Sequence, residues 1–84
     1  MKAMLRDLVD SKSIASIGYA PHRCELEIEF RQSGDVYRYF EVPAAEHAEF
    51  MAAESKGTYL NQVFKSKRHP YVVVKRGRST ESES

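Results

Sequence analysis

The sequence predicts an α+β fold: a small antiparallel β-meander with one longer and one short helix packed on one face. Three observations lead to this fold class. The segment Cys24–Arg31 alternates strictly between apolar and charged residues, a second β-rich segment, Val36–Val42, follows a turn, and Ala44–Ser55 has high helix propensity. A chain of 84 residues forms one domain and buries only about 60% of its unfolded surface, so its core is thin.

The meander is predicted to contain three strands in chain order. The first covers Ile14–Tyr19 and is followed by a turn that contains Pro21. The second, Cys24–Arg31, has Leu26 and Ile28 on its apolar face, whereas the opposite face carries three glutamates. Strict alternation of this kind predicts one buried face and one face in water. The exposed acidic row consists of Glu25, Glu27 and Glu29.

The two helices are predicted to follow the meander. Pro43 fits the first turn of the longer helix, where a missing N–H costs nothing. Gly57 suits a left-handed C-terminal cap, and Thr58 then caps a short helix over Tyr59–Lys65. The face of the longer helix expected to pack on the sheet consists of Ala44, His47, Ala48 and Met51.

The chain divides into a lead-in at residues 1–12, a domain at residues 13–75 and a disordered polar tail at residues 76–84. The lead-in pattern fits a short helical face and an extended segment equally well. Pro70 ends the short helix, and Tyr71–Lys75 reads as a further C-terminal strand. No apolar run is long enough for a membrane span, and no secretory signal is visible, so we expect a soluble, cytoplasmic monomer.

Two tyrosines one residue apart, Tyr37 and Tyr39, share a strand face and form either a stacking platform or part of the core. A hairpin loop centred on Ser33 and Gly34 would place Glu29 opposite Arg38 and both tyrosines on the apolar face. Core is therefore the favoured interpretation, although the outward Phe40 and Val42 would fit an odd-length loop with a bulge. The predicted core is Ile17, Leu26, Ile28, Phe30, Tyr37, Tyr39, Met51, Tyr59, Val63 and Phe64.

Several motifs in order resemble the KTSC domain, a family named for its occurrence at the C-terminus of some lysyl-tRNA synthetases and found also as small bacterial proteins. The resemblance covers residues 13–71 and includes a Tyr-X-Tyr motif, a Val-Pro pair and a Ser-X-Gly-X-aromatic-X-Asn segment. Ala20 departs from the family pattern, which often has Asp there. The resemblance implies RNA binding only by association with the synthetases. The matching residues, interpreted as mainly structural, are Tyr37, Tyr39, Pro43, Gly57, Tyr59 and Asn61.

A basic end is the main functional signal, because residues 65–78 contain six basic residues and no acid. Contacts from this segment to phosphates would give weak RNA binding, with tRNA as one candidate and a dissociation constant of about 10⁻⁴–10⁻⁶ M at physiological salt. The plain alternative is a solvated end. Tyr59 and Tyr71 flank the run and could stack bases, but the core is the favoured location for both. The candidate nucleic-acid-binding residues are Lys65, Lys67, Arg68, Lys75, Arg76 and Arg78.

Other function classes find little support in the sequence. A single cysteine, Cys24, rules out a disulfide framework and a multi-cysteine zinc site, and no nucleophile–base constellation is visible. We therefore expect no enzyme activity, no metal and no cofactor. Asn61 is expected to be buried and hydrogen-bonded. The alternative function is protein–protein interaction through the exposed sheet face that carries Glu27, Arg38 and Phe40.

Overall fold

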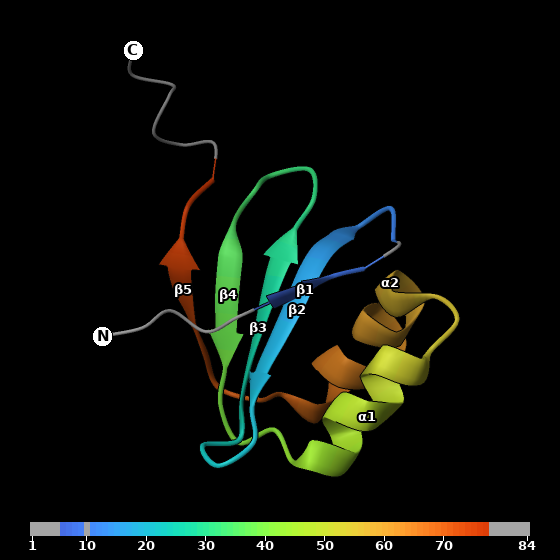
Figure 1. Cartoon of the computed structure of the whole chain (residues 1–84), viewed down its shortest axis with the longest axis vertical. Helices are drawn as coiled ribbons and strands as arrows, with labels where there is room; N and C mark the ends of the chain where they lie inside the picture. Colours follow the sequence, from blue (N-terminus) through green and yellow to red (C-terminus); the bar gives the residue numbers. More distant parts are fainter. Residues whose placement is uncertain (1–5, 10, 78–84) are drawn as a thin grey trace.

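The computed structural model describes residues 6–9 and 11–77. They form a five-stranded antiparallel sheet in the order β1-β2-β3-β4-β5, with the helices gathered beside β2 and β3 (Figure 1). The predicted fold class is therefore confirmed, and the further C-terminal strand exists. The strands are β1 (Arg6–Leu8), β2 (Ile14–Ala20), β3 (Glu25–Phe30), β4 (Val36–Tyr39) and β5 (Tyr71–Lys75).

Part of the predicted lead-in belongs to the sheet. Arg6–Leu8 pairs antiparallel with β2 as an edge strand, so the extended alternative is the correct one for these residues. At the other end, Arg76 and Gly77 were expected in the tail, but the Gly77 N–H donates to the Asp35 carboxylate at 2.9 Å. Residues 1–5 and 78–84 lie outside the described residues.

A β-bulge in β2 changes the pattern expected from strict alternation. Ile14 pairs with Phe30 and Ser16 with Glu29, so two steps along β2 match one step along β3. The extra residue turns both Ile14 and Ile17 toward the helices, and both are fully buried. Simple alternation along the strand would place Ile14 and Ile17 on opposite faces.

The β3–β4 hairpin has the predicted facing but a different register. Its loop covers residues 31–34, because a hydrogen bond from the Phe30 N–H to the Asp35 carbonyl closes the hairpin. Tyr39 therefore lies opposite Leu26, and Arg38 lies opposite Glu27 instead of Glu29. The shift is an even number of residues, so both tyrosines remain on the face that packs against the helices.

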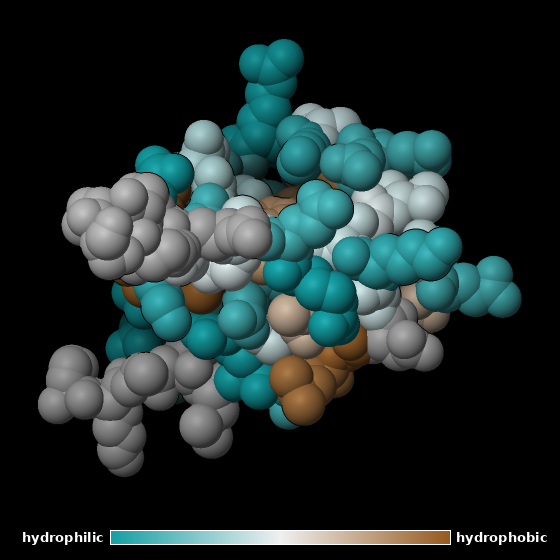
Figure 2. Space-filling model, turned by 90° about the horizontal axis from the view of Figure 1, so that it is seen from above, coloured by the Kyte–Doolittle hydropathy of each residue, from teal (hydrophilic) through white to brown (hydrophobic). Residues whose placement is uncertain are grey.

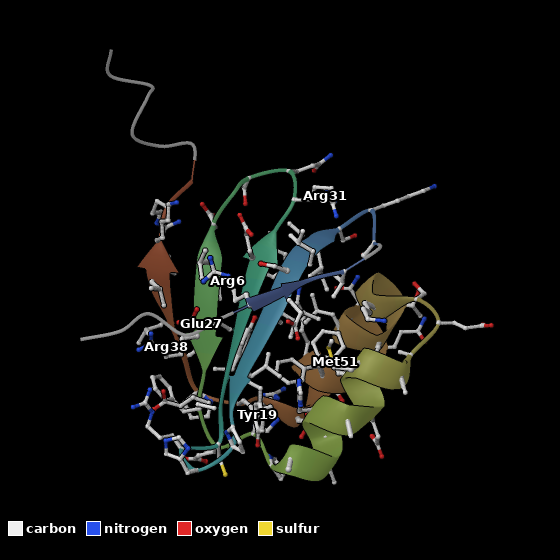
Figure 3. The ribbon with its side chains drawn as sticks, in the orientation of Figure 1. Arg6, Tyr19, Glu27, Arg31, Arg38 and Met51 are labelled. Carbon is white, nitrogen blue, oxygen red and sulfur yellow. The ribbon has the colours of Figure 1, made fainter. Side chains whose placement is uncertain are left out.

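The acidic row is not a solvated face, which corrects the prediction for Glu27. Its carboxylate is 2% exposed and forms ion pairs with Arg6 at 2.7 Å and with Arg38 at 2.6 Å. Figure 3 shows these three labelled side chains close together. Glu29 accepts a hydrogen bond from the Ser16 hydroxyl at 2.8 Å. A strand of the lead-in thus supplies a charge that makes burial of Glu27 tolerable.

The helical region is more irregular than predicted. Ser55, not Thr58, caps the second helix by accepting from the Thr58 N–H at 3.2 Å. Gly57 lies inside that helix and not in a left-handed cap; an added Cβ would meet the Ser13 hydroxyl at 3.1 Å. The segments are α1 (Ala44–Ala52), α2 (Lys56–Tyr59), a π-helical turn η1 (Leu60–Phe64) and a 3₁₀ turn η2 (Lys65–Lys67).

The core joins the inner sheet face to one side of the helices. Phe50 is fully buried, whereas Ala44 and Ala48 of the predicted packing face are exposed. Val42 is also fully buried and not outward, because Glu41 at φ 62° redirects the chain after β4. The predicted core members that are buried are Ile17, Leu26, Ile28, Tyr39 and Phe64, and those partly buried are Phe30, Tyr37, Met51, Tyr59 and Val63.

Gly77→Ala is expected to cost about 1 kcal/mol of unfolding free energy, at the low end for overpacking because β5 ends here. A Cβ at Gly77 would lie 2.3 Å from the Gly34 carbonyl carbon, so backbone must move. Urea unfolding measures the loss. Gly57→Ala is the matched control with a smaller effect, since the Ser13 side chain can rotate. Equal losses in the two variants would contradict this account.

Candidate functional site

A cleft of about 770 Å³ opens on the helix-facing side of the sheet, next to β4 and β5. Its walls come from the β1–β2 connection, the β3–β4 hairpin loop and the segment that joins η2 to β5. Aromatic rings make its floor, and cationic side chains stand at its rim. The lining residues that matter below are Lys12, Phe30, Asp35, Tyr37, Tyr39, Phe64, Lys65, Arg68, His69 and Tyr71.

The aromatic floor resolves the question posed by the two tyrosines. Tyr39 is 8% exposed and belongs to the core, where its ring meets Phe64 edge-on at 4.9 Å. Tyr37 is half-buried and stacks on Tyr71 with 5.3 Å between ring centroids and 26° between planes. Tyr71, expected in the core, is 55% exposed. One tyrosine of the motif is therefore core, and the other supports an accessible ring.

Burial, and then the neighbouring phenols of Tyr37 and Tyr71, raise the pKa of Tyr39 to about 12. The floor of the cleft thus keeps a neutral phenol throughout the physiological pH range. Since the raised pKa favours the protonated phenol in the folded state, its contribution to stability is present below pH 10. That contribution is lost as the pH rises through about 12.

Three cationic side chains stand at the rim of the cleft: Lys12, Lys65 and Arg68. Arg68 ends the 3₁₀ turn in a left-handed conformation, with φ 56°, and its N–H donates to the Lys65 carbonyl at 3.2 Å. Among the described residues, Asp35 is the carboxylate that lines the cleft; it accepts from the Gly77 N–H and lies 3.9 Å from the Arg76 guanidinium. The rim therefore favours anions.

A carboxylate–imidazole pair supports the wall of the cleft. The His69 Nε2 lies 2.9 and 3.0 Å from the two carboxylate oxygens of Glu46, which is buried in the first turn of α1. The His69 ring also packs against Phe64 at 5.0 Å. The contact of Nε2 with Glu46 therefore fixes the orientation of the His69 ring in the wall of the cleft.

The structure separates the six basic residues that the sequence grouped as one end. Lys65 and Arg68 line the cleft, whereas Lys67 is exposed outside it. Lys75 pairs with Val36 and Tyr71 with Tyr39, so β5 carries Lys75 and Arg76 about 13 Å away from the Arg68 end. Arg78 lies outside the described residues. A linear charge count could not show this separation, because it ignores the length of the last strand.

Two lining residues were missed from the sequence. Lys12 comes from the supposed lead-in, and only the pairing of β1 with β2 brings the connection between them to the cleft. The other is His69, which was not among the predicted site residues. The sequence signal for His69 was its position between a basic segment and Pro70, because a helical region must end before that proline.

The remaining residues of the family motif lie away from the cleft. Asn61 is exposed on η1, so the expectation that it is buried is wrong. Tyr59 is half-buried, stacks on Phe50 at 5.1 Å and donates its hydroxyl to Glu49. Pro43 precedes the first residue of α1, as expected from its missing N–H. The contacts of Tyr59 and Pro43 within the domain are consistent with a structural role for both residues.

The outer sheet face offers less than expected for a protein partner. Glu27 is buried between two arginines and presents almost no surface. Phe40 is half-buried, and its N–H donates to the Pro70 carbonyl at 2.8 Å. Exposed apolar side chains on β5 are instead Val72 and Val74, at 48% and 45%. In the view from above, hydrophilic side chains cover most of the surface (Figure 2).

None of the helices in the described part of the chain has the length and apolar composition needed to span a bilayer.

Comparisons with known proteins give consistent matches. A family model described as the KTSC domain matches residues 10–67. An uncharacterized protein of Stutzerimonas stutzeri (strain A1501) is 41% identical over 68 residues, which are 81% of this chain and 94% of that protein. A protein of Tsukamurella paurometabola is 37% identical over 57 residues, 68% of this chain and 84% of the relative. The crystal structure of a KTSC domain protein from Yersinia pestis matches with a TM-score of 0.79 and 42% identity, covering 87% of this chain and all (100%) of that one.

Proposed function

We propose that this chain, which belongs to the KTSC domain family, is a non-catalytic module that binds RNA weakly through its aromatic, cation-rimmed cleft. The observation that supports this proposal is the half-exposed ring of Tyr71, stacked on Tyr37 in a cleft that Lys12, Lys65 and Arg68 also line. The interface is thus a part of the basic segment combined with a residue from the N-terminal side, and not the whole segment 65–78.

Two forces act at such a surface. Stacking of a base on an aromatic side chain contributes about 1–3 kcal/mol and tolerates every base, because each base has a π-face. Cationic side chains at the rim attract phosphates and release counterions, which makes the affinity fall as salt rises. With three cationic side chains from the described residues lining the cleft, we expect binding to be weak at physiological salt and measurable at low salt.

The double variant K65E/R68E is expected to lose most RNA affinity at low salt, because two attractive charges at the rim become repulsive. Removing two phosphate contacts should also reduce the slope of log affinity against log salt by about 1.4 for a single strand. Fluorescence anisotropy with a labelled single-stranded oligonucleotide at several salt concentrations measures both quantities.

The matched control is K67E/K75E, which changes the net charge by the same amount at exposed positions outside the cleft. It should retain more affinity than K65E/R68E. Equal losses in the two double variants would mean that net charge, and not the cleft, determines binding. No binding by the unmodified chain at low salt would end the proposal.

A second candidate function is protein–protein interaction through the outer side of β5. Val72 and Val74 are both about half exposed there, and Val72 lies opposite Arg38 on the neighbouring strand. The affinity of an apolar contact of this kind would not fall as salt rises. A salt series therefore distinguishes it from RNA binding, whose affinity does fall.

A further inference from the structure

We infer that the cleft takes an unpaired nucleotide of a single-stranded RNA, with its base stacked on the Tyr37–Tyr71 rings, and that it excludes duplex RNA. This inference rests on the proposed RNA-binding function and names the form of RNA that the same site accepts. Three features of the cleft support it: the rings and loops that line it, the arrangement of the stack and the polar groups beside it.

The rings form the floor of a concave site. Loop residues Gln32 and Ser33 line it from the β3–β4 hairpin, and His69 lines it from the segment before β5. A base in an A-form helix is stacked and paired, and proteins reach such helices mainly through their 2′-hydroxyls and phosphates. An unpaired base can leave its stack and enter between the walls. The concavity therefore selects against a duplex.

The stack has one open end. Phe30 meets Tyr37 edge-on at 5.4 Å, and Tyr37 stacks on Tyr71 at 5.3 Å. Tyr39 contributes support from below, at 5.5 Å from the Tyr71 ring, but is itself buried. Tyr71, at 55% exposure, is the member of this row that a ligand can reach most easily. A base would continue a row of rings that the protein has already assembled.

Polar groups stand where the rest of a nucleotide would lie. Lys65 and Arg68 offer charge to a phosphate at the rim. The Glu46 carboxylate lies 2.9 Å from Nε2 of His69 and holds the imidazole ring in the lining of the cleft. A volume of about 770 Å³ falls within the range of about 300–1,000 Å³ found for small-ligand sites. The cleft therefore combines stacking and charge around one nucleotide unit.

The test is a set of amide NMR titrations at low salt on the full chain. Three probes are compared: a single-stranded RNA, a blunt duplex of the same sequence and a nucleoside monophosphate. The single strand should shift amides around Tyr37, Arg68 and Tyr71, and the duplex should bind at least about tenfold more weakly. The monophosphate should shift the same amides with lower affinity, because it lacks neighbouring phosphates.

Variants at Tyr71 test the stack itself. Tyr71→Leu should weaken binding of the single strand by about 5- to 150-fold, the range that corresponds to one stacked base. Tyr71→Trp keeps an aromatic surface and should retain affinity. Val72→Ala changes an exposed neighbour on the opposite side of the same strand and should have no effect. Dispersed amide spectra establish that each variant is folded.

The outcomes separate this inference from the proposal on which it rests. Duplex RNA that binds as tightly as the single strand, with shifts at the cleft, would overturn the inference and leave RNA binding intact. A monophosphate that binds as tightly as the strand would overturn the assignment to RNA and point to a free nucleotide. Unchanged affinity in Tyr71→Leu would also overturn it. Absence of shifts with every RNA would overturn both.

Discussion

Replacing Phe64 by alanine is expected to lower the free energy of unfolding by about 3–5 kcal/mol, the cost of removing a large aromatic side chain from a core. Phe64 is 1% exposed, and its ring contacts Tyr39 edge-on at 4.9 Å and Phe50 at 5.6 Å. It connects the helical region to the sheet at the floor of the cleft.

Urea unfolding followed by circular dichroism measures the effect, and Phe64→Leu provides a milder version should the alanine variant fail to fold. Val63→Ala is the matched control, because Val63 is adjacent but only half-buried. It should cost clearly less. A Phe64→Leu variant as stable as the unmodified chain would show that the aromatic contacts of Phe64 contribute nothing beyond volume.

Replacing Glu27 by alanine is expected to cost about 2–3 kcal/mol, below the usual 3–5 kcal/mol for a broken buried pair. The lower value follows from the two arginines, whose side chains remain 27% and 31% exposed and can be hydrated once the carboxylate is gone. Without Glu27, Arg6 and Arg38 lose the carboxylate that pairs with both of them. The edge strand β1, which has only β2 as its neighbour, should loosen first.

Glu25→Ala is the control on the same strand and the same face. Its partner is Arg23 at 3.5 Å, and that arginine is 56% exposed, so an effect below about 0.5 kcal/mol is expected. Chemical unfolding measures both free energies, and amide hydrogen exchange in residues 6–8 measures the loosening of β1. A Glu27 effect as small as that of Glu25 would mean that the buried ion pairs do not stabilise the fold.

Much of the fold was predictable because alternation and helix propensity act locally. The pattern of Cys24–Arg31 was sufficient to identify a half-buried strand and to place the two tyrosines on the correct face. The family resemblance inferred from the motifs is confirmed by the match over residues 10–67. Burial of Glu27 was not predictable in the same way, because it depends on an ion pair with Arg6, which lies 21 positions earlier in the chain.

The site was predictable only in part, because a cleft is a property of three segments that meet. The sequence identified Lys65 and Arg68 as candidate contacts, and both line the cleft. It did not identify Lys12 or His69, and it assigned Tyr71 to the core. Strand β5 explains the last error: as an edge strand it has a neighbour on one side only, so its apolar side chains are less covered than their identity suggests.

The two edge strands of the sheet determine which residues must be included when this domain is fused to another protein. The family match ends at residue 67, before β5, and begins at residue 10, after β1. An excised segment with those limits would lack Tyr71, and Glu27 would keep one of its two arginines. It would also present two new unpaired edges, on β2 and β4, to other strands. A domain transferred to another protein should therefore include residues 6–77, and the range matched by the family model, residues 10–67, lies within it.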